Sequence, residues 1–286
     1  MSRWRPELLH LGINREGCCG FFSPAIGHAI ERKRAPEAAL SLAFEQASPS
    51  AVTPTTHDFE TLAYALRGLG PSPEAVICVL ADDLLRYWIT DRPRGLRGLA
   101  ELRGVVKADF ESRFGDLAVD WRLICDPWPK WTNDLACAAP LSLLEGLQHV
   151  FQSLGVRRWS LAPFLTTAIN VHRHKLPVDG FCFAIAQGRT LSVIHTSNCR
   201  WGSVQCHAVS LADAETVACF ALADAVRHGL ELPRTIFSLG IAVDEEIQGQ
   251  LSDDQPALVS LDNSFPVDLI RMNHGAMGLA LMGAIL

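Results

Sequence analysis

The sequence lacks long apolar runs and has no excess of positive charge. No stretch reaches the roughly 18 apolar residues that a membrane-spanning helix needs, and the longest, residues 275–286, predicts a buried terminal helix. The 31 acidic residues outnumber the 25 basic ones and give a formal net charge of −6. A broad basic face for nucleic acid or an anionic membrane is therefore not expected. These shortages argue against an integral membrane protein and a general nucleic-acid-binding protein.

The first 20 residues also lack the continuous apolar segment of an export signal, because charged residues such as Arg3, Arg5 and Glu7 interrupt them. The nine cysteines are scattered, odd in number, and without the spacing of a disulfide framework. This usage is typical of reduced thiols in a cytoplasmic protein. With 49% hydrophobic and 20% charged residues among 286, the chain has the composition of a folded protein with two lobes or one large domain.

Spacings typical of zinc sites and of serine nucleophiles are missing as well. The chain has no Cys-X2-Cys or His-X3-His pair and no Gly-X-Ser-X-Gly elbow. Soft metal ligands do gather in the second half, but we expect them to be structural. They are His172, His174, Cys182, His195, Cys199, Cys206 and His207. The sequence therefore predicts no metal site and no catalytic residue.

Apolar periodicity predicts two halves with a similar rhythm. Strands are expected at residues 8–13, 18–22, 76–80, 84–90, 119–125, 135–139, 158–161, 181–186, 190–195, 202–209, 235–239 and 258–261. Helices are expected at residues 58–69, with Thr56 as a cap, and at 96–114, 142–154, 163–174, 213–228, 244–251 and the C-terminus. Residues 38–47 fit either a helix or an edge strand. A hairpin, further strands and then helices occur twice, which indicates a duplicated α/β lobe.

Several segments in this order carry a resemblance. The first strand reads Leu9-His10-Leu11-Gly12-Ile13-Asn14, the strand at 135–139 precedes a helix that ends before Gly155, and the chain finishes with small residues at 274–280. This order resembles the actin-like ATPase superfamily. Within it the chain resembles the PilM-type pilus assembly proteins and the cytoplasmic domain of GspL-type secretion proteins, in which the first strand reads Leu-Gly-Ile-Asp.

The resemblance implies a two-lobed actin-like fold of the α/β class, built from duplicated ribonuclease H-like lobes. The first lobe would span residues 1–160, with an inserted subdomain at about 58–139, and the second lobe residues 161–286. It also implies a place for Mg-nucleotide, formed by two hairpins with an Asp-X-Gly pattern and by a third, glycine-rich segment.

This sequence departs from the pattern at all three elements. The first hairpin reads Asn14-Arg15-Glu16, with an amide in place of the carboxylate that organises magnesium. The best matches to the second and third elements are Ala184-Ile185-Ala186 and the segment containing Gly240-Ile241. A phosphate-binding turn needs glycine for close backbone approach. The positions Asn14, Glu16, Ala184, Ala186, Gly240 and Ile241 are therefore predicted to be a degenerate nucleotide site, in a pseudo-ATPase without a cofactor.

The resemblance further implies a scaffold component of a type IV pilus or type II secretion assembly platform. Its partner would be the cytoplasmic tail of a bitopic, PilN-like inner-membrane protein, and the chain would be peripheral to the membrane through that partner, without inserting itself. Trp128 and Trp131 lie in a proline-rich loop and are candidates for partner binding. These indoles fit equally well as covers over the end of a strand pair.

Two other functions remain open at this stage. The first is an ATP-binding protein whose motifs have drifted and still work. The second is a small-molecule enzyme that uses the cleft between the lobes, for which a deep pocket lined by His195, Asp179 and a thiol would be the expected sign.

Overall fold

A computed structural model describes residues 7–24, 40–44, 53–69, 72–126, 131–210, 212–241 and 256–261. The contacts form two compact units. One contains the described residues of Met1–Leu85 and Pro140–Val171, and the other those of Arg86–Ala139 and His172–Asn263. The predicted lobe boundary near residue 160 and the predicted insertion stay predictions, because compactness does not test where one lobe of a duplicated fold ends. The helices predicted at 244–251 and 275–286 lie outside the described residues.

The first unit is built on a five-stranded sheet with the order β3-β2-β1-β4-β8. Its strands are β1 (Glu7–Asn14), β2 (Gly17–Pro24), β3 (Leu40–Ala43), β4 (Ala75–Leu80) and β8 (Arg158–Pro163). The first three strands pair antiparallel, and β4 and β8 continue the sheet in parallel. The predicted hairpin is confirmed, and the ambiguous stretch at 38–47 contains an edge strand.

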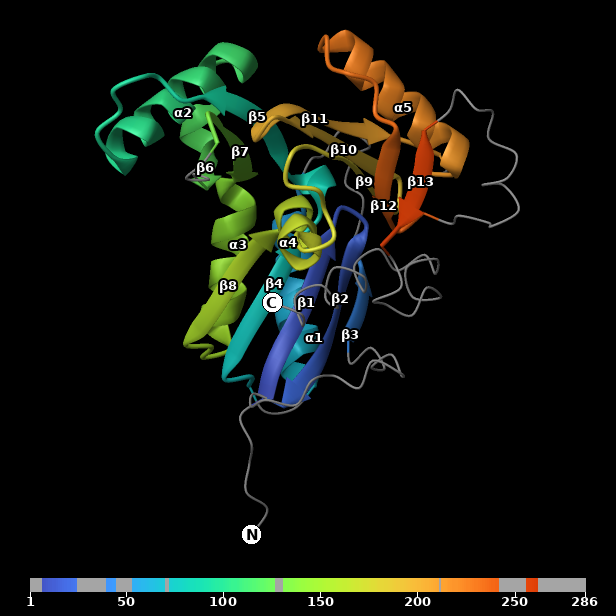
Figure 1. Ribbon diagram of the computed structural model, residues 1–286. Coiled ribbons are helices and arrows are strands. Elements are labelled where there is room, and N and C mark those ends of the chain that lie inside the picture. The colour runs from blue at the N-terminus through green and yellow to red at the C-terminus, as the bar shows by residue number, and fades with distance from the viewer. Residues whose placement is uncertain are drawn as a thin grey trace. The chain divides into compact units, whose positions relative to one another are not determined.

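The second unit contains a five-stranded sheet with the order β11-β10-β9-β12-β13. Its strands are β9 (Cys182–Gln187), β10 (Thr190–Ser197), β11 (Arg200–Ala208), β12 (Thr235–Leu239) and β13 (Ala257–Ser260). Again three strands pair antiparallel and two continue in parallel. Both sheets therefore have one topology (Figure 1), which confirms the duplicated α/β fold predicted from the sequence.

Helices α1 (Thr56–Gly68) and α3 (Leu141–Ser153) pack on each other in the first unit, and α4 (Phe164–His172) follows β8. The cap of α1 is Thr55 and not the predicted Thr56, because the Thr55 hydroxyl and the Asp58 carboxylate bond each other's backbone amides in a capping box. A side chain at Gly146 would lie 2.3 Å from the Phe59 ring, so glycine allows this close helix packing.

In the second unit, α5 (Ala214–Arg227) lies along one face of the sheet (Figure 1). Small and branched side chains of α5, such as Val217 and Ala221, pack against β9 and β10 and form the core there. Asp213 caps the helix by accepting a hydrogen bond from the Thr216 amide at 2.8 Å.

The second unit also contains a three-stranded sheet, β5-β7-β6, with α2 packed on it. These elements are β5 (Arg86–Asp91), α2 (Leu99–Phe114), β6 (Trp121–Asp126) and β7 (Asn133–Pro140). Trp88 packs against Phe110 and Phe114 with ring centroids 5.2 and 6.0 Å away. The buried Asn133 amide donates to the Trp201 carbonyl at 2.8 Å and accepts from the Trp201 amide at 2.9 Å. These two bonds tie β7 to the edge strand β11.

Across the described ranges, no helix is both long enough and apolar enough to cross a membrane.

Candidate functional site

The Asn14 side chain closes the turn between β1 and β2 by hydrogen bonds to the backbone of the turn. Asn14 ends β1, Arg15 and Glu16 form an exposed two-residue turn, and Gly17 begins β2. The buried Asn14 side chain accepts hydrogen bonds through Oδ1 from the Glu16 amide at 3.0 Å and the Gly17 amide at 2.8 Å. The backbone groups that a phosphate-binding turn would offer to a ligand are therefore bonded within the turn.

Strand β3 fixes this turn from the other side. The Phe44 amide donates to the Glu16 carbonyl at 2.9 Å. A Cβ atom at Gly17 would lie 2.0 Å from the Leu42 carbonyl oxygen, so only glycine fits at the start of β2. The glycine in this hairpin thus serves strand packing.

Acidic groups surround the same edge of the first sheet. The Arg15 Nε donates to the Asp83 carbonyl at 3.0 Å, and the Arg15 amide lies 3.4 Å from the Asp83 carboxylate. Burial raises the pKa of Asp83 to about 6 against the opposing effect of Arg15, and the charges of Asp82 and Glu16 raise it further. A phosphate brought here would meet like charges, which disfavours an anionic ligand.

Asp82 has a structural task at this edge that the sequence analysis missed. Its carboxylate is buried and accepts a hydrogen bond from the Leu165 amide at 3.0 Å, at the start of α4. This bond satisfies a helix-terminal amide that would otherwise be open to an anion. The signal in the sequence was the pair Asp82-Asp83, one residue after the apolar strand β4.

The equivalent turn in the second sheet lies between β9 and β10. Gln187 pairs with Thr190 across a two-residue turn of Gly188 and Arg189, as Asn14 pairs with Gly17 in the first sheet. Gly188 has a φ of 56°, which favours glycine. By its place in the hairpin, Gln187 is the counterpart of Asn14. Both hairpins therefore end their first strand with an amide side chain.

The positions selected in the sequence as the second hairpin, Ala184 and Ala186, lie inside β9, and both are buried in the core beneath α5. Gly240 follows β12 with a φ of 76°, and Ile241 is buried in the same core. The structure thus places Gly240 at a strand end, as expected for a ligand-binding turn, but fills the next position with a core side chain.

Trp131 is half-buried and lies against Trp201, with ring centroids 4.5 Å apart. Its indole thus packs beside the bonds that join β7 to β11. The second partner-binding candidate, Trp128, lies outside the described residues.

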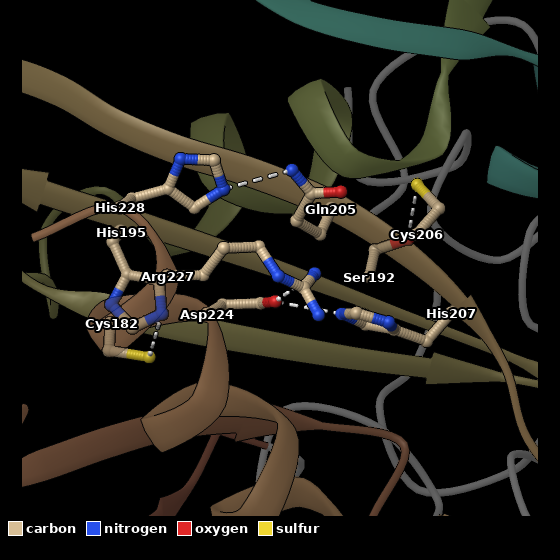
Figure 2. Close-up of polar contacts among 9 residues, drawn as sticks. All are labelled: Cys182, Ser192, His195, Gln205, Cys206, His207, Asp224, Arg227 and His228. Atoms are coloured by element: carbon tan, nitrogen blue, oxygen red, sulfur yellow. Dashed lines mark hydrogen bonds and ion pairs between the residues drawn. The ribbon is translucent and has the colours of Figure 1, made fainter.

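The thiol and imidazole candidates come together only in part. Cys182 Sγ lies 3.8 Å from His195 Nε2 in the core beneath α5. Figure 2 shows the two side chains facing each other. Burial lowers the pKa of His195, and burial raises the pKa of the Cys182 thiol well above its ordinary value. Together with Asp179 they line a pocket of about 570 Å³ within the second unit. A protonated, buried thiol is a poor nucleophile, so this pocket has the expected lining without an activated group.

His207 belongs to a separate polar contact. Its Nε2 lies 2.7 Å from the buried Asp224 carboxylate, which also pairs with Arg227 at 3.4 Å (Figure 2). Among the residues that the structure describes, no three acidic, histidine or cysteine side chains are arranged to hold a metal ion. The soft ligands selected in the sequence therefore contribute pairs and packing in this part of the chain.

No protein-family model and no curated protein matches the sequence. A Bacteroides thetaiotaomicron protein with an actin-like ATPase fold and unknown function has a TM-score of 0.59 and 10% identity, over 96% of each chain. The chain has an actin-like fold.

Two further solved structures are similar in fold. A chain of the PilM–PilN type IV pilus biogenesis complex has a TM-score of 0.56 and 13% identity, over 98% of this chain and 99% of that one. The cytoplasmic domain of EpsL, an inner-membrane component of the Vibrio cholerae type II secretion system, has a TM-score of 0.52 and 13% identity, over 84% of each chain. The fold predicted from the resemblance is confirmed.

Proposed function

We propose that this chain is a cytoplasmic scaffold component of a type IV pilus or type II secretion assembly platform, and that it has lost ATPase activity. The similarity to a chain of the PilM–PilN complex extends over nearly the full length, and EpsL cytoplasmic domain shares the same fold. Both comparisons support an assembly role.

The loss of ATPase activity rests on the β1–β2 turn. Mg-nucleotide needs a carboxylate to organise the cation and open backbone amides to hold phosphate. In place of the carboxylate the chain has the Asn14 side chain, whose Oδ1 already accepts hydrogen bonds from the Glu16 and Gly17 backbone amides. An exposed Glu16 lies beside it. In the second hairpin the first strand ends in Gln187, again an amide and not a carboxylate. These residues do not fit Mg-nucleotide, which supports a pseudo-ATPase without a cofactor.

The proposed partner is the cytoplasmic tail of a bitopic, PilN-like inner-membrane protein. Peptide docking into a preformed groove is a common recognition mode. The chain would then be held at the inner membrane by that partner, without inserting itself and without binding nucleic acid. The net charge of −6 agrees with the last point.

Calorimetric titration with Mg-ATP tests the lost activity. We expect no saturable heat for the unchanged chain up to millimolar nucleotide. The double variant Asn14→Asp with Glu16→Gly is the matched comparison, because it restores the Asp-X-Gly pattern at one hairpin only. Low-micromolar binding by the unchanged chain would overturn the proposal and favour the alternative of a working ATP-binding protein.

A pull-down from detergent-extracted membranes tests the scaffold role. The tagged chain is expected to retain one bitopic inner-membrane protein in a one-to-one ratio, and a synthetic peptide of that protein's cytoplasmic tail is expected to compete. Failure of the tail peptide to compete contradicts the proposed mode of binding. Retention of no bitopic protein contradicts the scaffold role itself.

A small-molecule enzyme is the second candidate function. The pocket lined by Asp179, Cys182 and His195 favours it. We rank it below the scaffold because burial keeps the Cys182 thiol protonated. Rapid labelling of Cys182 by iodoacetamide at neutral pH, compared with a Cys182→Ala variant, would reverse this ranking.

A further inference from the structure

A second and larger groove, of about 880 Å³, lies within the second unit. It is lined by residues of β5, α2, β11 and the segment that follows α5. Four of the lining side chains are aromatic: Tyr87, Trp88, Phe114 and Trp201. Small-molecule sites typically have volumes of roughly 300–1,000 Å³, an apolar or aromatic lining and a few polar groups. The size and lining of this groove therefore fit a small ligand with an apolar body.

Two buried polar groups of the lining residues lack hydrogen-bond partners. Trp88 is 3% exposed and Ser203 is 2% exposed, and neither the Trp88 Nε1 nor the Ser203 Oγ has a partner in the described part of the chain. Buried polar groups are almost always hydrogen-bonded, so each exception calls for a physical reason. An indole N–H can only donate. A ligand atom that satisfies it must therefore be an acceptor.

The charged residues at the groove favour an acceptor that is also an anion. Arg113 and Arg200 line it, and Asp91 is the one acidic residue among the lining residues that the structure describes. Arg200 pairs with Asp91 at 2.7 Å. Arg113 pairs through Nε with Asp109 of its own helix at 2.8 Å and donates through a second nitrogen to the Ile89 carbonyl at 3.2 Å. Solvent-exposed contacts of this kind are weak and exchange readily. Both guanidinium groups are therefore available to a bound oxyanion, for which arginine has matching geometry.

Two further polar residues, Gln205 and His228, lie at the rim of the groove. His228 Nε2 and Gln205 Nε2 lie 3.2 Å apart (Figure 2), and both residues line the groove. Gln205 Nε2 is an amide nitrogen and can only donate, so His228 Nε2 accepts the hydrogen bond between them. The amide oxygen of Gln205 and the second ring nitrogen of His228 provide further polar atoms at this rim.

We propose that this groove binds a small organic oxyanion, a carboxylate or phosphate attached to an aromatic or apolar body. The oxyanion accepts hydrogen bonds from Trp88 Nε1 and Ser203 Oγ and pairs with Arg113 and Arg200, and the body packs on the aromatic side chains. This inference goes beyond the proposed scaffold function and stands on the groove alone.

The test follows the indole N–H resonances of the full chain labelled with 15N-tryptophan. A Trp88→Phe variant assigns the Trp88 signal among those of the seven tryptophans. The probes are indole-3-acetate and phenyl phosphate, with acetate and inorganic phosphate as forms without the apolar body and benzylamine as a cationic ring. We expect a saturable downfield shift of the Trp88 resonance with indole-3-acetate, phenyl phosphate or both, which also identifies the preferred oxyanion.

Variants then connect this shift to the groove. Arg200→Gln and Ser203→Ala are each expected to raise the Kd by about 5- to 30-fold, whereas Arg103→Gln, an exposed arginine of α2 outside the groove, leaves it unchanged. Ser203→Ala is also expected to raise the Tm of the free chain, because it removes an unpaired buried hydroxyl. The proposal is overturned if no oxyanion moves the Trp88 resonance, if benzylamine moves it equally, or if both groove variants bind like the unchanged chain.

Discussion

Replacing Asn133 by alanine is expected to loosen the attachment of β7 to the edge strand β11. The Asn133 side chain is 1% exposed and bonds both backbone groups of the buried Trp201. Leaving a buried donor or acceptor unsatisfied costs about 1–3 kcal/mol. With two such groups, the free energy of unfolding should fall by about 2–6 kcal/mol.

Asn133→Asp separates the two bonds. A carboxylate at this position still accepts a hydrogen bond from the Trp201 amide but cannot donate one to the Trp201 carbonyl. It would also bury a negative charge, because within the described part of the chain the Asn133 side chain bonds only backbone groups. We therefore expect this variant to lose at least as much stability as Asn133→Ala. Thr132→Ala is the matched control, because Thr132 is the exposed neighbour.

Hydrogen exchange at the Trp201 amide, together with chemical unfolding, provides the assay. In Asn133→Ala the Trp201 amide should exchange at least about 30-fold faster, the equivalent of about 2 kcal/mol. The Thr132→Ala control should change neither quantity by more than about 0.5 kcal/mol. An Asn133→Ala chain with unchanged Trp201 exchange and unchanged stability would refute the reasoning, because it would show that these two bonds contribute nothing.

Three other predictions concern stability. Because the pKa of Asp83 is raised to about 6, above its value in the unfolded chain, stability should fall as the pH rises from 4 to 6; Asp83→Asn should remove this slope and raise the midpoint of urea unfolding at pH 7. His172 should change stability in the opposite direction with pH, because burial lowers its pKa to about 4, below its value in the unfolded chain. Stability should therefore fall as the pH drops from 6.5 to 4, and a pH series of thermal melts should show a smaller fall for His172→Leu. Gly146→Ala should destabilise the packing of α1 on α3 by about 1–3 kcal/mol in chemical unfolding, because its Cβ would lie 2.3 Å from the Phe59 ring, and an unchanged midpoint would show that the ring moves aside freely.

Most of the strands and helices could be predicted from the sequence, because their apolar residues repeat with clear periods. The hairpin at β1 and β2 and the amphipathic helix α1 are examples, and the duplicated order of the two sheets followed from them. The capping residue of α1 was misplaced by one position, because Thr55 and Thr56 are chemically alike and only Thr55 has the extended backbone of a cap.

The details of the candidate sites depend on contacts that have no local signal. The bonds between Asn133 and Trp201 join residues 68 positions apart. In the second hairpin, the resemblance selected Ala184 and Ala186, whereas the turn places Gln187 at the position equivalent to Asn14. Apolar periodicity locates a strand but not the residue at which the turn begins, so that position needed the pairing register.

The contact between Gly17 and the Leu42 carbonyl has an evolutionary consequence. A mutation that adds a side chain at position 17 would separate β2 from β3. A mutation that removes the Asn14 oxygen would leave the Glu16 and Gly17 amides without their hydrogen-bond acceptor. The residues between positions 14 and 17, Arg15 and Glu16, are exposed, and the Arg15 side chain bonds a backbone carbonyl, that of Asp83. Substitutions in related genes should therefore concentrate at positions 15 and 16. Positions 14 and 17 should change little, whether or not the related proteins bind a nucleotide.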